Sequence, residues 1–224
     1  MIELYLDTAN LKTISRFNQC LPLKGITTNP SILAKSGVGL NFLLPELTKI
    51  LGEQARFHAQ LVSLSVDDMV EEAKQLNALP YDLVVKIPAT ETGLCAIKKI
   101  SASGIPTLAT AIYSAHQGFL AALCGANYLA PYVNRIDAMG IDAIATVADL
   151  QLLLDKNQLN CKILAASFKN TYQALEIMKL GVGAITLPVD IAEQMFFNPS
   201  ATAAVDQFTQ DWQAVFGKKL SFQS

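Results

Sequence analysis

The sequence predicts an α/β protein, a (β/α)8 TIM barrel with an extra C-terminal helix. Short apolar runs with β-branched residues alternate with segments of helical spacing along almost the whole chain, which indicates βα units and a parallel sheet. Eight such runs in 224 residues leave about 28 residues per unit, enough for a strand, a helix and two loops. The alternative, a doubly wound open sheet, favours a glycine-rich turn after the first strand, whereas this chain has Asp7-Thr8-Ala9-Asn10 there.

The predicted strands are short apolar runs. In chain order they are Glu3–Leu6, Gly25–Thr27, Arg56–Leu61, Leu83–Ile87, Thr107–Ala111, Tyr128–Pro131, Lys162–Ala165 and Ala184–Leu187. Between these strands, apolar residues recur at helical spacing. The clearest helical segments are Leu40–Leu51, Val66–Leu79, Ala145–Leu154 and Tyr172–Leu180.

Capping residues mark several helix ends. Ser65, followed by Asp67 and Asp68, has the form of an N-cap with acidic residues in the first turn. The segment Thr146–Asp149 resembles a capping box with aspartate in place of glutamate. Three glycines are expected to end helices. They are Gly104, Gly125 and Gly181.

The end of the chain differs from the rest. After Pro199, the segment Ser200–Gly217 predicts an amphipathic helix whose apolar face carries the only tryptophan, Trp212. This helix is either the last helix of the barrel or an arm that packs on a neighbouring subunit. We therefore divide the chain into a barrel, residues 1–199, and a C-terminal helix and tail, residues 200–224, with the tail from Lys218 expected to be mobile.

The composition excludes several classes of protein. Hydrophobic residues make up 51% of the chain and charged residues 16%, which is enough for a large core and argues against disorder. The formal net charge is −2, without the clustered Lys and Arg that a nucleic-acid or membrane-surface partner requires. The start of the chain lacks a signal-peptide pattern, and the longest apolar region, Gly118–Val133, is too short to span a bilayer, so we expect a cytoplasmic protein.

The cysteines and histidines do not indicate a metal site. His58 and His116 are too few and too isolated for a zinc or iron centre. The cysteines are far apart, and we expect them to be reduced thiols in the core. They are Cys20, Cys95, Cys124 and Cys161.

A lysine interrupts the most apolar predicted strand. Lys86 lies within Leu83–Ile87, where an ammonium group is rarely buried without compensation. In one interpretation Lys86 lies near the strand end and extends its charged group to water. In the other it is a desolvated amine with a lowered pKa, which attacks a carbonyl carbon to form a Schiff base.

Polar residues lie at the ends of seven predicted strands, where the active site of a barrel is found. They are Asp7, Asn29, Gln60, Lys86, Thr110, Tyr132 with Arg135, and Ser167 with Lys169. Arg135, Ser167 and Lys169 offer a guanidinium fork, a hydroxyl and a point charge, which suits a phosphate monoester. Asp7 is placed to hold a substrate hydroxyl and to move protons.

Most of these residues also have a structural interpretation. Asp7 or Thr8 would cap the next helix, and Asn29-Pro30 has the form of an N-cap followed by proline at the first helical position. Thr110 would be a strand residue with high β-propensity. Tyr132 would be a core ring with a solvated hydroxyl, and Ser167 would be a turn residue. Packing explains each residue singly, but it does not explain why so many gather around Lys86.

The chain resembles the transaldolase family essentially from end to end, and four motifs carry the resemblance. Two resemble family signatures: Gly25–Leu33, and Leu83–Ile100 around Lys86. The other two are Ala130–Asp137 and Ala165–Lys169. Within the family, the chain is similar to the fructose-6-phosphate aldolases, because it has Gln60 where transaldolases carry glutamate and Tyr132 where they usually carry phenylalanine.

The resemblance implies a class I aldolase for fructose 6-phosphate. It implies that Lys86 forms an imine with the C2 ketone, that Tyr132, through a water, takes the C4 hydroxyl proton, and that Gln60 and Thr110 hold the hydrolytic water. Asp7 and Asn29 would hold the dihydroxyacetone hydroxyls. The phosphate would be bound by Arg135 and Ser167, with Lys169 as a weaker candidate.

The resemblance also bears on cofactors and partners. The iminium is the electron sink, so no metal or organic cofactor is expected. The partners expected are a sugar phosphate, dihydroxyacetone and further copies of the chain in a decamer of two pentamers, with the C-terminal helix reaching a neighbour. The alternatives are a transaldolase, which passes the dihydroxyacetone unit to another sugar phosphate, and, more remotely, a sugar-phosphate-binding barrel without catalysis.

Overall fold

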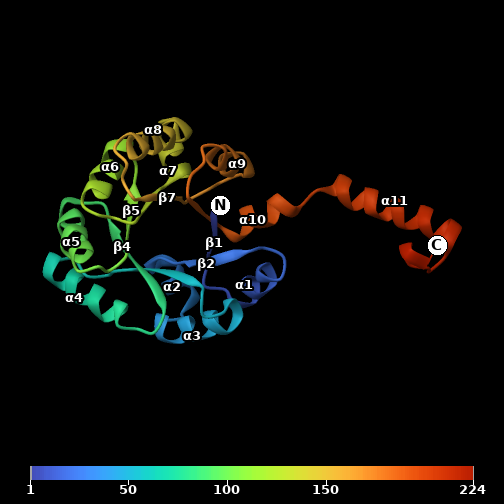
Figure 1. The fold of residues 1–224 in the computed structure, drawn as a ribbon, viewed down its shortest axis with the longest axis horizontal. Coiled ribbons are helices and arrows are strands. Elements are labelled where there is room, and N and C mark those ends of the chain that lie inside the picture. Colours follow the sequence, from blue (N-terminus) through green and yellow to red (C-terminus); the bar gives the residue numbers. More distant parts are fainter. Residues whose placement is uncertain (1, 224) are drawn as a thin grey trace.

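Eight parallel strands close into a barrel in sequence order in the computed structural model, which describes residues 2–223 (Figure 1). The strands are β1 Glu3–Asp7, β2 Leu23–Thr27, β3 Arg56–Gln60, β4 Asp82–Pro88, β5 Thr107–Ile112, β6 Tyr128–Pro131, β7 Lys162–Ala165 and β8 Ala184–Leu187. The predicted (β/α)8 barrel is confirmed. Each predicted strand is found within two residues of its expected bounds, because the alternation of apolar runs and helical segments is regular.

Helices surround the barrel in the ring seen in Figure 1, and the last helix, α11, extends away from that ring. They are α1 Leu11–Asn18, α2 Pro30–Ser36, α3 Leu40–Leu51, α4 Val66–Asn77, α5 Glu91–Ala102, α6 Ala115–Leu123, α7 Val133–Ala138, α8 Ala143–Lys156, α9 Thr171–Lys179, α10 Val189–Phe196 and α11 Pro199–Phe216. Two helices follow each of β2, β6 and β8. Within the described part of the chain, no helix is both long and apolar enough to cross a membrane.

Most of the predicted helix ends are confirmed, with one correction. The Ser65 side chain accepts the hydrogen bond of Asp68 N and caps α4 as expected. The predicted capping box at Thr146 is wrong, because α8 begins earlier and Asp142 is its N-cap, accepting from Ala145 N. Thr146 lies inside the first turn and donates to the Asp142 carbonyl, a bond that is open to a hydroxyl within a helix.

The three glycines expected to end helices do so, with φ of 77° for Gly104, 95° for Gly125 and 76° for Gly181. A fourth glycine, Gly93, is required by a close approach. A Cβ atom there would lie 1.8 Å from the carbonyl oxygen of Pro88, so only glycine lets α5 pack this closely on the end of β4.

The two apolar regions of the molecule lie on opposite faces of the strands. The larger region lies between the strands and the helices. The smaller fills the barrel interior, with Tyr5, Val84, Leu108 and Tyr128 among its buried side chains. Both follow from the strand period, which sends alternate residues inward and outward.

A polar network closes the amino end of the barrel. Glu3 accepts hydrogen bonds from the hydroxyls of Tyr5 and Tyr128, each at 2.9 Å, and from Lys162 Nζ at 2.7 Å. Arg56 donates to the Tyr128 hydroxyl at 2.7 Å and pairs with Asp82. The carboxyl end of the barrel is left for the site.

The cysteines are free, and their expected place in the core is wrong for Cys20 and Cys95, whereas Cys124 and Cys161 pack against the core. Cys20 and Cys95 are exposed, and Cys124 and Cys161 are only partly buried. Cys20 lies two residues beyond the end of α1, and Cys95 lies on the outward face of α5 beside the buried Ala96. Cysteine is often buried, but the phase of α5 exposes Cys95.

The structure shows that the C-terminal helix is not the last helix of the barrel. The eighth position in the helical ring is taken by α10, which sequence analysis missed, and α11 extends away from the barrel (Figure 1). Val205, Phe208 and Val215 on α11 are 60–73% exposed. The tail expected to be mobile contains a 3-10 turn, Ser221–Gln223, and Trp212 donates to the Lys219 carbonyl at 2.8 Å.

Candidate active site

A cavity of about 220 Å³ lies at the carboxyl end of the barrel. It is lined by Asp7, Asn29, Lys86, Leu108, Ala130, Tyr132, Arg135, Leu164, Ala166, Ser167, Phe168, Thr186 and Pro188. Six of the nine residues singled out from the sequence are in this lining, and they come from the ends of β1, β2, β4, β6 and β7. The structure therefore brings these six residues together at the strand ends where the active site of a barrel is expected.

Lys86 lies on β4 within the barrel interior. It is 5% exposed, and its Nζ donates to the backbone carbonyl of Thr28 at 2.7 Å. Burial lowers the pKa of Lys86, and the negative charge of Asp7 opposes that shift. The interpretation in which Lys86 extends to water is wrong, and the desolvated amine remains.

Asp7 is held by threonines that the sequence analysis did not single out. Thr27 Oγ1 donates to Asp7 Oδ1 at 2.7 Å and lies 2.7 Å from Thr186 Oγ1. Thr186 lines the cavity, so β8 also contributes a polar group. Both threonines lie within predicted strands, Thr27 as the last residue of its strand, and their β-propensity concealed this role.

Two of the capping alternatives are settled by the structure. Asp7 and Thr8 do not cap α1, because Asn10 occupies that position and accepts from Thr13 N at 3.0 Å. Asn29 does cap α2, with Oδ1 accepting from Ile32 N at 3.0 Å. Asn29 also lines the cavity, so the cap uses the carbonyl oxygen and leaves the amide NH2 group for a ligand.

Tyr132 forms a pair with Thr110. The two hydroxyl oxygens are 2.8 Å apart, and Thr110 is 1% exposed. Burial raises the pKa of Tyr132 more than the Thr110 hydrogen bond and the Arg135 charge lower it. The phenol is therefore neutral near pH 7 and carries a proton that it can exchange with a substrate.

Arg135 is fixed by two aromatic rings. Its guanidinium lies 4.7 Å from the centroid of the Tyr132 ring and donates to the Tyr113 hydroxyl at 3.3 Å. The rings of Tyr113 and Tyr132 meet edge to face at 5.7 Å. The aromatic contacts restrain the guanidinium of Arg135, which lines the cavity together with Ser167.

Three of the sequence-predicted residues lie outside the lining. Thr110 contacts it through Tyr132, and Gln60 is half-buried on β3, paired in register with Lys86. Lys169 is exposed and does not line the cavity. Ser167 has φ of 63°, and this left-handed residue redirects the chain before Lys169.

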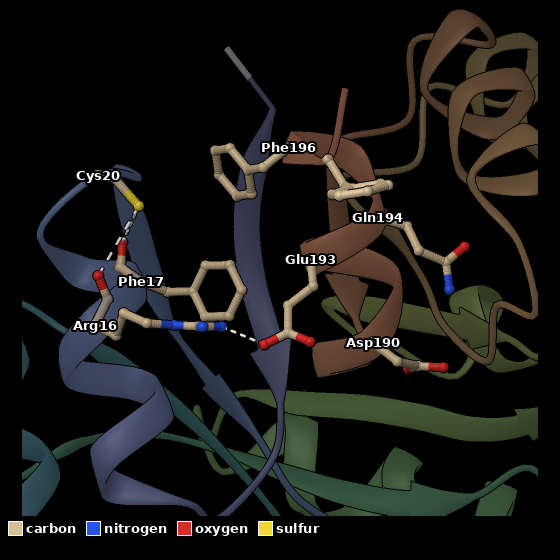
Figure 2. A pocket seen from close by; sticks show the side chains of 8 residues that line it. Arg16, Phe17, Cys20, Asp190, Glu193, Gln194 and Phe196 are labelled. Carbon is tan, nitrogen blue, oxygen red and sulfur yellow. Dashed lines mark hydrogen bonds and ion pairs between the residues drawn. The ribbon is translucent and has the colours of Figure 1, made fainter. Parts of the chain in front are cut away.

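A second cavity, of about 840 Å³, lies between α1 and α10 (Figure 2). Phe17 and Phe196 face each other there with ring centroids 5.9 Å apart, and Arg16 forms an ion pair with Glu193. None of the sequence-predicted site residues lines this cavity.

The fold and the site define a (β/α)8 barrel with a buried lysine amine in a cavity at the carboxyl ends of its strands. The chain belongs to the transaldolase/fructose-6-phosphate aldolase family, whose profile matches residues 4–222. The family comprises enzymes of the aldolase and transaldolase type, and this match does not distinguish the two branches.

Solved structures with low sequence identity share the fold. A protein assigned as an isomerase from Sinorhizobium meliloti has a TM-score of 0.63 at 10% identity over 86% of this chain and 53% of its own. A member of the enolase superfamily from Agrobacterium tumefaciens has a TM-score of 0.63 at 13% identity over 86% of this chain and 51% of its own. A protein assigned as a fructose-1,6-biphosphate aldolase from Coccidioides immitis has a TM-score of 0.57 at 12% identity over 98% and 80%. The chain thus spans about half the length of the first two, and all three show the fold alone.

Proposed function

We propose that the protein is a class I aldolase that reversibly cleaves fructose 6-phosphate into dihydroxyacetone and glyceraldehyde 3-phosphate. The observation that carries the proposal is the buried Lys86 amine, which is 5% exposed and opens on the cavity at the carboxyl end of the barrel. Burial lowers the pKa of Lys86, and an amine with a lowered pKa is more readily a free nucleophile for a ketone.

The proposed reaction begins at C2 of the ketose. The Lys86 amine adds to the C2 carbonyl, and loss of water gives an iminium ion. Tyr132 relays the C4 hydroxyl proton through a water, because a neutral phenol accepts one proton only as it passes its own on. The C3–C4 bond breaks, and its electron pair moves onto the iminium to form an enamine, whose C3 is the final acceptor of the relayed proton. Glyceraldehyde 3-phosphate leaves, the enamine is protonated at C3, and water hydrolyses the resulting imine to release dihydroxyacetone.

The remaining residues bind the two ends of the substrate in this proposal. Asp7 and Asn29 hold the hydroxyls of the dihydroxyacetone unit. Arg135 and Ser167 bind the phosphate at the opposite side of the cavity, where a guanidinium fork matches phosphate oxygens. Lys169 adds only a distant positive charge, because it is exposed outside the lining.

Gln60 and Thr110 hold the hydrolytic water in the proposal. We assign this role to Gln60 because its pairing in register with Lys86 places both residues at one level of neighbouring strands. We assign it to Thr110 because its hydroxyl contacts the hydroxyl of Tyr132. An amide and a hydroxyl can each donate to and accept from one water molecule, which suits this task.

Borohydride trapping tests the chemistry. Reduction in the presence of dihydroxyacetone should leave a covalent adduct on Lys86, located by peptide mass mapping. The variant Lys86→Ala should give no adduct, whereas Lys98→Ala, which removes an exposed lysine, should react like the native protein. An unmodified Lys86 would rule out Schiff-base catalysis and leave the binding-only barrel.

A second assay separates the aldolase from a transaldolase. Fructose 6-phosphate is incubated with erythrose 4-phosphate, and the products are identified. Free dihydroxyacetone supports the aldolase. Sedoheptulose 7-phosphate without free dihydroxyacetone would assign the protein to the transaldolase branch instead.

We also propose that the protein assembles as a decamer of two pentamers, in which α11 packs on a neighbouring subunit. The support is the extended position of α11 and its exposed apolar side chains, including Phe208 at 69%. The solution mass by light scattering tests this, and Phe208→Asp should reduce it. A native protein of monomer mass would exclude the assembly.

A further inference from the structure

The end of β5, just before the loop to α6, contains a strained residue that is held by one glutamine. Ala111 has φ of 57°, a conformation that an L residue rarely adopts. Ser114 caps α6, and three residues later the Gln117 side chain turns back onto the loop. Its Oε1 accepts from Tyr113 N at 2.8 Å, and its Nε2 donates to the carbonyls of Ala89 at 2.9 Å and Ala111 at 3.0 Å.

The loop between β7 and α9 repeats this arrangement at the same spacing. Ser167 has φ of 63°, Asn170 caps α9, and Gln173 lies three residues beyond the cap. Gln173 Oε1 accepts from Lys169 N at 2.8 Å, the position that corresponds to Tyr113 N in the first loop. Its Nε2 donates to Asp137 Oδ2 at 2.6 Å.

The two strained residues adjoin the site. Within residues 2–223, only three residues other than glycine have positive φ, and Ala111 and Ser167 are two of them. Such a residue is strained and persists only where its surroundings hold it. The glutamines supply that restraint, because each joins its loop to a second element.

The second element differs between the two glutamines. Gln117 joins the strained loop to Ala89, just past the strand that carries Lys86. The residue before Ala111 is Thr110, whose hydroxyl contacts Tyr132. Gln117 therefore fixes the Thr110–Tyr132 pair relative to the strand of Lys86.

Gln173, by contrast, joins the loop of Ser167 to the helix of Arg135. Asp137 lies on α7 two residues beyond Arg135, and its other oxygen accepts from Ala143 N at 3.0 Å. Gln173 is 7% exposed, so its hydrogen bonds are shielded from water. Its restraint acts on the two residues proposed to bind phosphate.

We propose that Gln117 and Gln173 are paired positioning residues, of which Gln117 serves proton transfer and Gln173 serves phosphate binding. The division of tasks rests on the proposed function, whereas the restraint itself rests on the hydrogen bonds.

Aldol synthesis from dihydroxyacetone tests the division, with glyceraldehyde 3-phosphate or glyceraldehyde as acceptor. The variant Gln117→Met should lower kcat about tenfold with both acceptors and change KM little. Gln173→Met should raise KM about tenfold for the phosphorylated acceptor and leave the reaction with glyceraldehyde unchanged. Gln75→Met is the matched control, because Gln75 is exposed and bonds only to Glu71 on its own helix.

A measurement independent of turnover tests the restraint. Hydrogen exchange at the amides of Tyr113 and Lys169 should accelerate in Gln117→Met and Gln173→Met, respectively. Gln117→Glu keeps the acceptor for Tyr113 N but loses both donors, so it provides a second variant if the first fails to fold. Calorimetric binding of inorganic phosphate should weaken in Gln173→Met alone.

The outcomes separate the two proposals. Exchange rates and kinetics like those of Gln75→Met would overturn the positioning role, as would equal loss of kcat with both acceptors in Gln173→Met. A native protein that forms no product would overturn the aldolase. The exchange and phosphate-binding measurements would then still decide the role of the glutamines.

Discussion

Lys86 Nζ donates to the carbonyl oxygen of Thr28 at 2.7 Å, which ties β4 to the end of β2 inside the barrel. The carbonyl oxygen is uncharged, so it orients the amine but does not neutralise a positive charge on it. The only charge that raises the pKa of Lys86 against the effect of burial is that of Asp7. The protonation of the amine is therefore set by two opposed effects that substitution can separate.

Asp7→Asn should shift imine formation to lower pH. Burial already lowers the pKa of Lys86, and removal of the Asp7 charge takes away the attraction that opposes this shift. The amine then loses its proton at a lower pH than in the native protein. The rate of borohydride-trapped adduct formation with dihydroxyacetone, followed across neutral and alkaline pH, measures the shift, and movement to higher pH would contradict it.

The fold was predictable from the sequence because barrel strands and helices leave a local signal. Most strands are rich in apolar residues, and Leu40–Leu51 was predicted with its observed bounds. The prediction failed at the end of the chain, where α10 has only eight residues and buries only Ile191 and Ala192. The longer apolar face of α11 suggested a barrel position that α10 already fills.

The site was predictable where residues at strand ends converge on one rim. Asp7, Lys86 and Ser167 follow directly from that rule. Gln117 and Gln173 did not, because their role depends on hydrogen bonds to segments far along the chain. A glutamine three residues after an N-cap is common in helices, so the sequence alone gives it no functional meaning.

Tyr132→Phe should slow cleavage while leaving imine formation intact. The neutral phenol exchanges the C4 hydroxyl proton in the proposed mechanism, and loss of such a group lowers the rate by about 10²- to 10⁴-fold. Trapping of dihydroxyacetone on Lys86 should continue, because that step does not use the C4 hydroxyl. Tyr172→Phe, on the exposed side of α9, is the control, and a full rate in Tyr132→Phe would exclude the proton-transfer role.

His58→Phe should stabilise the barrel. His58 is 1% exposed and meets the rings of Tyr5 and Tyr128 edge to face at 4.9 and 5.2 Å. Neither ring nitrogen has a hydrogen-bond partner within the described part of the chain. Phenylalanine keeps the ring contacts and removes the unpaired nitrogens, so we expect a gain of about 1–3 kcal/mol in the free energy of unfolding.

The same substitution should reduce the acid sensitivity of the fold. Burial, followed by the charges of Lys86 and Arg56, holds the pKa of His58 well below its usual range. A histidine neutral in the folded state contributes its full stability above the unfolded pKa of about 6.5, and this is lost as pH falls below that value. Urea unfolding at neutral and mildly acidic pH measures both the gain in stability and the reduced acid sensitivity, with His116→Phe as the exposed control. An unchanged pH dependence in His58→Phe would contradict the lowered pKa of His58.

Glu3→Gln should weaken the amino end of the barrel without affecting the site. Burial raises the pKa of Glu3, but hydrogen bonds from Lys162, Tyr5 and Tyr128 outweigh it and lower the pKa overall. The carboxylate therefore stabilises the fold above its unfolded pKa, and the stability is lost as pH falls through the folded value. We expect a loss of about 1–3 kcal/mol at neutral pH by urea unfolding. Imine trapping should be unchanged, and loss of trapping in a folded variant would contradict the separation of the two barrel ends.

Gln60→Glu should shift the reaction from hydrolysis toward transfer. Gln60 is paired in register with Lys86, so a glutamate there places a negative charge beside the iminium ion. That charge stabilises the cationic imine against hydrolysis and prolongs the life of the bound dihydroxyacetone unit. With fructose 6-phosphate and erythrose 4-phosphate, the ratio of sedoheptulose 7-phosphate to free dihydroxyacetone should rise. Gln60→Met, which removes the amide without adding charge, should not raise this ratio, and an equal rise in both variants would show that the charge is not the cause.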